Sequence, residues 1–474
     1  MNADTLILKD AFAMAEAVRG KATSAVALVQ ASLNRIDATD KRVNAFTDVL
    51  RERALRRAGQ VDASLASANA ARTRELPLLG VPFAVKNLFD IAGLPTLAGS
   101  KIEREATPAR DDAALVRRLE SAGAVLVGAL NMDEYAYGFT TENSHVGACH
   151  NPHDLTRIAG GSSGGSGAAV AAGQVPLTLG SDTNGSIRVP SSLCGIFGLK
   201  PTFGRLPRTG SYPFISSLDH LGPFARSARD LALAYDAMQG PEAGSAHDPG
   251  CLQRAVEPTV SQLSHGVSGL RIGILGGYFR QRAQADALSA VDRVAEALHA
   301  RKVVELPMVE AGRAAAFLIT NSEGAALHLA DLRRRPQDFE PLSRDRFLAG
   351  ALLPAAWVAR AQRVRRLYAE RVATLFERFD ILLAPATPCA ATPIGTEWFE
   401  INGHRLPVRP NMGVLTQPIS CIGLPVCAVP VWGAHPSLPI GVQVIGAPWR
   451  EDLVLRVAAA LEGAGVVHAP VAAL

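Results

Sequence analysis

The chain has 474 residues, 48% of them hydrophobic and 19% charged, and a formal net charge of +4 at pH 7. This composition provides enough apolar side chains for a large folded core and excludes an intrinsically disordered chain. The positive excess is small, and its densest run, at residues 333–335, is too short for a nucleic-acid interface, so no nucleic-acid partner is expected.

Helices are predicted over residues 5 to about 70. Thr23 or Ser24 is placed to cap one of them, because apolar residues follow at helical spacing. The Ala-rich stretch of residues 51–71 continues the helical pattern. The N-terminus, MNADTLILKD, lacks the features of a signal peptide, and no run of about 18 uncharged apolar residues predicts a membrane span. We therefore expect a cytoplasmic protein without a membrane partner.

A buried strand is predicted over residues 78–93, because an apolar run there lies between turn signals. A helix over residues 112–122 and a short strand over 124–129 follow, which predicts βαβ units and a mostly parallel sheet. The segment GSGAAVAAG, residues 165–173, has helical spacing but only tiny side chains, so we expect a closely packed helix. VPLTLGSD, residues 175–182, predicts the next strand.

A polar, Pro- and Gly-rich stretch at residues 241–268 marks a candidate boundary in the chain. A strand is predicted over residues 270–277, followed by helices at about 284–300, 310–334 and 353–379. In the C-terminal part, ILLAPATP, LPVCAVPVW and PIGVQVIGAP predict further strands, and EDLVLRVAAALEGAG predicts a last helix ended by glycine.

Cysteine and histidine spacing matches neither a disulfide framework nor a common metal motif. No two cysteines form a CxxC pair, and the eleven histidines form neither HxxxH nor HExxH. We expect buried thiols, no metal site and no cofactor. The six cysteines are Cys149, Cys194, Cys251, Cys389, Cys421 and Cys427.

Ser186 is the candidate nucleophile. It lies just past a predicted strand in DTNGSIR, where Asn184 and Gly185 permit a tight turn. Such a turn directs the backbone N–H groups of Thr183, Asn184, Gly185 and Ser186 to one side, which is the arrangement of an oxyanion hole. The alternative is a turn serine that only caps a helix.

Lys86, in the apolar stretch VPFAVKNLFD, is the candidate base. An amine accepts a proton only when neutral, and burial lowers the pKa of lysine. The alternative is a lysine at a strand end that reaches solvent. Ser162, in GGSSGGSG, has a hydroxyl that can pass a proton from Ser186 to Lys86. A phosphate loop is the competing interpretation of GGSSGGSG, but the Walker pattern is absent.

The chain resembles the amidase signature enzymes. Their hallmark reads here GGSSGGSGAAVAAGQVPLTLGSDTNGSIRVP, followed by CGIFGLKPTFGR, and the resemblance extends over nearly the whole chain. It implies an α/β fold, with a large mixed, mostly parallel twisted sheet between layers of helices. It also implies a single domain over residues 1–474. The regions are N-terminal helices (1–70), a catalytic core (71–240), a largely helical specificity region (241–379) and C-terminal strands with a helix (380–474).

The same resemblance implies a Ser–cis-Ser–Lys triad of Ser186, Ser162 and Lys86, with the cis peptide bond before Ser162. Hydrolysis would pass through an acyl-enzyme. Further residues are implied around the substrate or in support of it, with Asp182 orienting the loop. These are Tyr137, Gly138, Ser163 and Arg188.

The substrate is harder to predict from the sequence. In bacterial glutamyl-tRNA amidotransferase, the glutaminase component is a relative in the family and carries an acidic residue three positions before a threonine to hold the ammonium of glutamine. Gly413 stands at that place in GVLTQP, which argues against glutamine. A glutaminase component, a general carboxamide amidase and a non-catalytic scaffold nevertheless remain as alternatives.

The wording AVKNLFDIAGLPTLAGSKI, NMDEYAYGFTTEN and RPQDFEPLSRDRF is similar to the carboxybiuret hydrolase branch of the family. That branch implies conversion of 1-carboxybiuret, a small-molecule amide of s-triazine (cyanuric acid) degradation, into ammonia and urea-1,3-dicarboxylate. It also implies a small helical partner subunit in a dimer of heterodimers. An anionic substrate predicts a cationic pocket. Arg334 is the first candidate for it, and the others are Arg344, Arg346 and His328.

Overall fold

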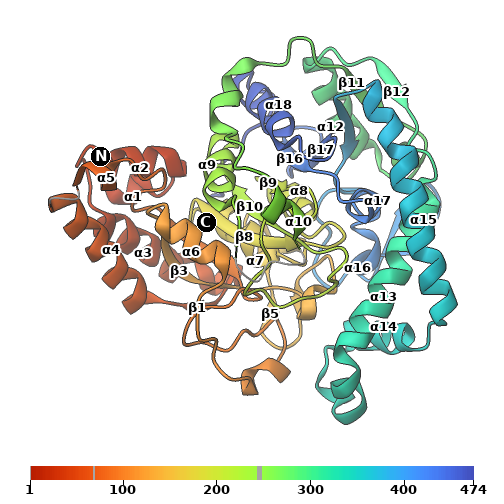
Figure 1. Ribbon diagram of the computed structural model, residues 1–474, viewed down its shortest axis with the longest axis horizontal. Coiled ribbons are helices and arrows are strands. Elements are labelled where there is room, and N and C mark those ends of the chain that lie inside the picture. Colours follow the sequence, from red (N-terminus) through yellow and green to blue (C-terminus); the bar gives the residue numbers. More distant parts are fainter. Residues whose placement is uncertain (1, 68–69, 243–247) are drawn as a thin grey trace.

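The computed structural model describes residues 2–67, 70–242 and 248–474. Helices of the N-terminal region form one end of the molecule (Figure 1). The Ser24 hydroxyl accepts a hydrogen bond from the Ala27 amide at 3.0 Å, so Ser24 rather than Thr23 is the cap. Residues 68 and 69 of the predicted helical stretch lie outside the described residues. The helices are α1 (Ala3–Leu6), α2 (Ala11–Arg19), α3 (Ala25–Val43), α4 (Arg51–Ala66) and α5 (Ala70–Arg74).

A short strand, β1 (Phe46–Val49), interrupts this region, where the sequence predicts only helix. Helix α3 ends at Asn44, which adopts the left-handed conformation with φ of 56°. The residues after it pair antiparallel with β3 (Val125–Leu130) at the edge of the sheet. Strand pairing outweighs local helical preference here.

An eleven-stranded sheet runs through the molecule in the order β1-β3-β2-β8-β10-β9-β16-β17-β13-β11-β12. Parallel and antiparallel pairs both occur in it, which confirms the mixed α/β fold class. The remaining strands of this sheet are β2 (Pro82–Lys86), β8 (Leu177–Asp182), β9 (Phe197–Lys200), β10 (His220–Ala225), β11 (Ile272–Leu275), β12 (Lys302–Val304), β13 (Ile381–Pro385), β16 (Val426–Val431) and β17 (Ile440–Gly446).

The expected majority of parallel pairs is not found. Six of the ten strand pairs that the described residues form in this sheet are antiparallel. Parallel pairing joins β2 to β3 and β8, and β11 to β12 and β13, where helices intervene along the chain. A parallel crossover needs about a dozen residues or more, and the short connection from β16 to β17, residues 432–439, permits only antiparallel pairing.

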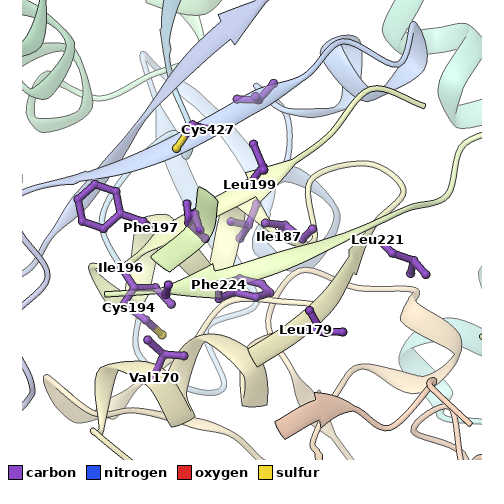
Figure 2. Packing of buried hydrophobic residues seen from close by; sticks show 14 of the residues in the cluster. Val170, Leu179, Ile187, Cys194, Ile196, Phe197, Leu199, Leu221, Phe224 and Cys427 are labelled. Atoms are coloured by element: carbon purple, nitrogen blue, oxygen red, sulfur yellow. The ribbon is translucent and has the colours of Figure 1, made fainter. Parts of the chain in front are cut away.

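Helices cover the sheet and bury its strands. Helices α6, α9 and α18 contact one another in that order, and α7 and α8 form a second contacting pair on the sheet. Figure 2 shows apolar side chains of α7, α8, β8, β9 and β10 packed into one cluster. The small residues of α7 allow the close packing predicted for it: a Cβ at Gly165 would lie 2.6 Å from the backbone of Asn131. The bounds are α6 (Ala114–Ser121), α7 (Gly164–Ala171), α8 (Arg188–Cys194), α9 (Ala228–Met238), α12 (Ala285–Ala297) and α18 (Glu451–Gly463).

Long helices form the end of the molecule opposite the N-terminal helices (Figure 1). Helices α13 (Val309–Arg334) and α15 (Ala355–Ala373) match two of the predicted helices, whereas α14 (Pro341–Ala351) lies between them and was not predicted. Helix α13 contacts α14, α15 and α17 (Gln417–Cys421). This packing brings α13, α14 and α17 together, although α17 is remote from the other two in the sequence.

Smaller elements complete the fold. Residues 243–247 of the candidate boundary lie outside the described residues, and α10 (Pro249–Gln253) forms within the rest of it. No helix in the described part of the chain has the length and apolar character needed to cross a membrane. The other elements are β4 (Glu142–Asn143), β5 (Gly147–Ala148), β6 (His150–Asn151), β7 (Asp154–Ile158), β14 (Trp398–Ile401), β15 (His404–Pro407), α11 (Tyr278–Gln281) and α16 (Val408–Asn411).

Candidate active site

Lys86 is the last residue of β2 and is fully buried. Its Nζ lies 2.7 Å from Ser162 Oγ and 2.9 Å from Ser181 Oγ. Strands β2 and β8 are parallel neighbours, so their carboxyl ends lie at the same edge of the sheet. Lys86 and Ser181, together with the turn that follows β8, therefore meet at this edge.

Burial is the main cause that lowers the pKa of Lys86, to about 7. The carboxylates of Asp133, Asp219 and Asp182 act in the opposite direction and favour the charged amine. Since desolvation outweighs these charges, a large fraction of the amine is neutral near pH 7. Lys86 therefore has the protonation behaviour that a general base at neutral pH requires.

Ser162 lies in the turn that leads into α7, and the Gly161–Ser162 peptide bond is cis. Its hydroxyl contacts the Lys86 amine, and its backbone carbonyl accepts a hydrogen bond from the Asp133 amide at 3.3 Å. The turn thus holds the Ser162 hydroxyl beside Lys86 in the buried interior, where Ser162 is fully covered.

Ser186 lies in the turn between β8 and α8 and lines a pocket. Gly185 has φ of 144°, and a Cβ there would overlap the hydroxyl of Thr416, so glycine is required at this point of the turn. The Thr416 hydroxyl donates a hydrogen bond to the Asn184 carbonyl at 2.7 Å. Within the described chain, no acceptor takes up the N–H groups of residues 183–186, which leaves them available to an oxyanion.

A buried ion pair holds this turn from behind. Arg188 Nε donates to Asp182 Oδ2 at 2.9 Å, and the Ile187 amide donates to the same oxygen at 3.2 Å. Burial raises the pKa of Asp182, but the charge and hydrogen bonds of Arg188 outweigh it and keep that pKa well below its usual range. The predicted orienting role of Asp182 thus has a structural basis.

Two residues predicted near the substrate lie instead in the wall behind the pocket. Arg188 is fully buried on Asp182, and Ser163 is fully buried with its hydroxyl donating to the Ser181 carbonyl at 3.2 Å. Neither lines the pocket. Both positions suit support of the site rather than contact with a substrate.

Ser181 is the contact of Lys86 that the sequence reasoning did not assign. It was noticed only as one of several hydroxyls in the glycine-rich segments. Its contact with Lys86 depends on the parallel pairing of β2 and β8, in which Val85 lies opposite Leu179. A signal would have been the place of Ser181 near the end of a strand, two residues beyond that register pair.

The pocket beside Ser186 has a mixed polar and aromatic lining. Tyr137 and Gly138 line it, as the resemblance implied. A Cβ at Gly138 would lie 2.6 Å from the Asp133 carboxylate, so this loop packs closely against the site. The other lining residues are Ala136, Phe139, Thr183, Asn184, Phe214, Phe317, Thr320, Arg346 and Gln417.

Of the four candidates for a cationic pocket, Arg346 alone lines this pocket. Its guanidinium lies 3.7 Å from the centre of the Tyr137 ring. Arg334, the first candidate, was wrongly placed by the sequence: its side chain is 73% exposed and pairs with Asp331 at 2.7 Å, one turn earlier on α13.

The other two candidates also lie away from the pocket. Arg344 forms an ion pair with the neighbouring Asp345. His328 is buried, with its ring centre 3.9 Å from that of Tyr135. Burial lowers the pKa of His328 to about 4, so its imidazole is neutral at pH 7 and offers no charge to an anion.

Metal ligands and reactive thiols are not part of this arrangement. In residues 2–67, 70–242 and 248–474, no group of three or more His, Cys, Asp or Glu side chains is placed to hold a metal ion. All six cysteines are buried thiols. The chemistry of the described site rests on an amine, hydroxyls and backbone amides.

The model of one protein family, Amidase, matches residues 27–455. The chain belongs to the amidase signature family. It is 59% identical to AtzE, a subunit of the 1-carboxybiuret hydrolase of Pseudomonas sp. (strain ADP), over 96% of this chain and 98% of that one. It is 39% identical to the glutamyl-tRNA(Gln) amidotransferase component of the same family from Anaeromyxobacter sp. (strain K), over 94% of each chain.

Solved structures agree with this membership. One belongs to an s-triazine catabolic enzyme described with an unexpected vestigial protein complex, and it matches with a TM-score of 0.94 at 58% identity over 97% of this chain and 100% of that one. A bacterial aryl acylamidase of the amidase signature family matches with a TM-score of 0.86 at 26% identity, over 96% of each chain. This amidase is therefore an enzyme that hydrolyses C–N bonds of small amides.

Proposed function

We propose that this amidase releases ammonia from 1-carboxybiuret and forms urea-1,3-dicarboxylate. The observation that carries the proposal is the contact between buried Lys86 and Ser162 beside a pocket that holds both Ser186 and Arg346. The 59% identity to a 1-carboxybiuret hydrolase component supports the choice of substrate. The bond broken would be the one between the terminal carbonyl carbon and its NH2 group.

In the proposed mechanism, neutral Lys86 accepts a proton from Ser162, which in turn takes the proton of Ser186. Ser186 Oγ attacks the terminal carbonyl, and the N–H groups of residues 183–186 stabilise the oxyanion. The C–N bond then breaks as the leaving nitrogen receives the proton, and ammonia departs. Water attacks the acyl-enzyme by the same proton route, which frees Ser186 and the second carboxylate.

Arg346 is proposed to bind the substrate carboxylate. It is the one charged residue that lines the pocket in the described part of the chain, and an arginine pairs well with a carboxylate. Gly413 supports a substrate other than glutamine, because a Cβ there would overlap the Phe139 ring. The acidic side chain that holds the ammonium of glutamine in the amidotransferase thus has no room here.

The decisive experiment follows ammonia release from 1-carboxybiuret, biuret, glutamine and a simple carboxamide by the purified protein. We expect the largest kcat/KM with 1-carboxybiuret. Turnover of glutamine without turnover of 1-carboxybiuret would contradict the proposal and favour a glutaminase. A protein that turns over none of them, either by itself or with a small helical partner, would favour the scaffold alternative.

Arg346→Met is expected to raise KM for 1-carboxybiuret by about 10- to 100-fold, because hydrogen bonds to a charged group contribute about 1.5 to 3 kcal/mol. Its effect on biuret, which lacks the carboxylate, should be several-fold smaller. Steady-state ammonia assays measure both. The matched control is Arg344→Met, two residues earlier on α14, whose partner is Asp345. Equal losses with both substrates would assign Arg346 a structural role.

We also propose that a small helical partner covers the outer face of α13 and α15, with two such pairs forming the assembly. A groove between these helices is lined by apolar residues, and Leu352 and Trp357 beside it are 83% and 56% exposed. Exposed apolar surface of this kind is typical of a protein interface. Trp357→Arg should release the helical partner, which light scattering would measure. A complex unaffected by this change would place the partner elsewhere.

A further inference from the structure

The pocket contains a second polar side chain, Gln417, at the first position of α17. Gln417 is 5% exposed and lies beside Thr416, whose hydroxyl supports the oxyanion turn. Helix α13 places Arg313, Phe317 and Thr320 along one face, because they are spaced four and three residues apart. Phe317 and Thr320 line the pocket, and Arg313 reaches Gln417 from the same face.

The orientation of the Gln417 amide is unambiguous. Arg313 Nε lies 2.8 Å from Gln417 Oε1, and Arg313 Nη2 lies 3.1 Å from Asn411 Oδ1. A guanidinium group has donors and no acceptor, so the amide atom that faces it must be the oxygen. Asn411 is itself held, because its Nδ2 donates to the Pro407 carbonyl at 2.9 Å.

Since Arg313 occupies the oxygen of this amide, the Nε2 group is the part left to interact with a ligand. No acceptor of the described chain takes up its hydrogens. A buried donor without a partner costs about 1 to 3 kcal/mol, so a ligand that supplies an acceptor is favoured. Gln417 is thus prepared to recognise an oxygen atom.

We propose that Gln417 Nε2 donates a hydrogen bond to the second carbonyl of an acylurea substrate, and that Arg313 is a positioning residue for it. The proposal rests on the function proposed above. In that function the reacting carbonyl occupies the turn of residues 183–186 and the carboxylate pairs with Arg346. The urea carbonyl between them is the remaining acceptor. Gln417 therefore selects acylureas over simple carboxamides, which lack a second carbonyl.

The test compares kcat/KM for 1-carboxybiuret, biuret and acetamide in Gln417→Glu. Glutamate still accepts from Arg313 but offers no donor to a carbonyl. We expect the ratio of kcat/KM for either acylurea to that for acetamide to fall by about 10- to 100-fold. Gln60→Glu is the matched control, because exposed Gln60 also accepts from an arginine, Arg57 Nη1 at 3.5 Å. Thermal melting checks that each variant folds.

Arg313→Met should lower the same ratio by about threefold to tenfold, because the amide is then free to turn, and Arg313→Lys should restore part of it. Equal losses with all substrates, or no loss, would overturn the inference. Failure of the proposed function has a different signature: the parent enzyme would not turn over 1-carboxybiuret. In that case biuret against acetamide, or another diacylated against a simple amide that the parent accepts, still tests Gln417.

Discussion

Replacement of Ser186 by alanine is expected to lower kcat for ammonia release by about six orders of magnitude, to the level of the residual chemistry of the pocket. The hydroxyl is the atom that would form the ester with the acyl group, and water cannot take its place in the turn without the proton route through Ser162. Single-turnover assays with mass spectrometry should detect an acyl-enzyme in the parent protein and none in the variant.

Stability is not expected to change with this substitution, because Ser186 makes no side-chain hydrogen bond within the described residues. Ser64→Ala, on the exposed side of α4, is the control for handling and purity. Substantial activity in Ser186→Ala would assign the nucleophile to another hydroxyl, for which Ser181 would be the first residue to test.

Lys86→Met is expected to lower kcat/KM by about 10²- to 10⁴-fold, the usual contribution of a general base. Burial depresses the pKa of Lys86 to about 7, and only the neutral amine accepts a proton. In the parent enzyme, kcat/KM should therefore rise with pH and level off above about 7. The residual rate of Lys86→Met should lack this acidic limb, which pH-rate profiles of both proteins would reveal.

The same shift gives a stability effect of known sign. Between about pH 7 and the ordinary value of 10.5, the unfolded chain holds the Lys86 proton and the folded chain does not. Stability therefore rises with pH through this window, and at neutral pH the buried amine is a cost. Lys86→Met should unfold at the same or a higher temperature than the parent. A lower melting temperature together with an unchanged pH profile would contradict the assigned role.

Most of the fold could be predicted from local patterns. Buried strands such as β2 and β8, and long helices such as α13, have the apolar periodicity that sequence reasoning detects. Strand β1 and helix α14 escaped this reasoning. Strand β1 is short and forms by pairing with β3, and α14 is held by packing against α13. Both depend on partners that lie outside the local sequence window.

The candidate site divides in the same way. The glycine- and serine-rich segments encode tight turns directly, because only glycine tolerates the backbone conformation at Gly185 and the contact with Thr416. Lys86 could be recognised from its apolar neighbours, which predict burial. Arg334 and Arg346, in contrast, are equivalent in the sequence, and nothing local tells which one faces the pocket.

The sequence by itself determined the family, the fold class and the chemical groups of the candidate site, because these depend on short motifs and on hydrophobic periodicity. The tertiary structure alone decided that Lys86 contacts Ser181 as well as Ser162, that Arg346 lines the pocket, and that Arg313 orients Gln417. The physical reason is that hydrogen bonds and ion pairs act over a few ångströms, and only packing of the sheet and helices brings such distant residues within that range.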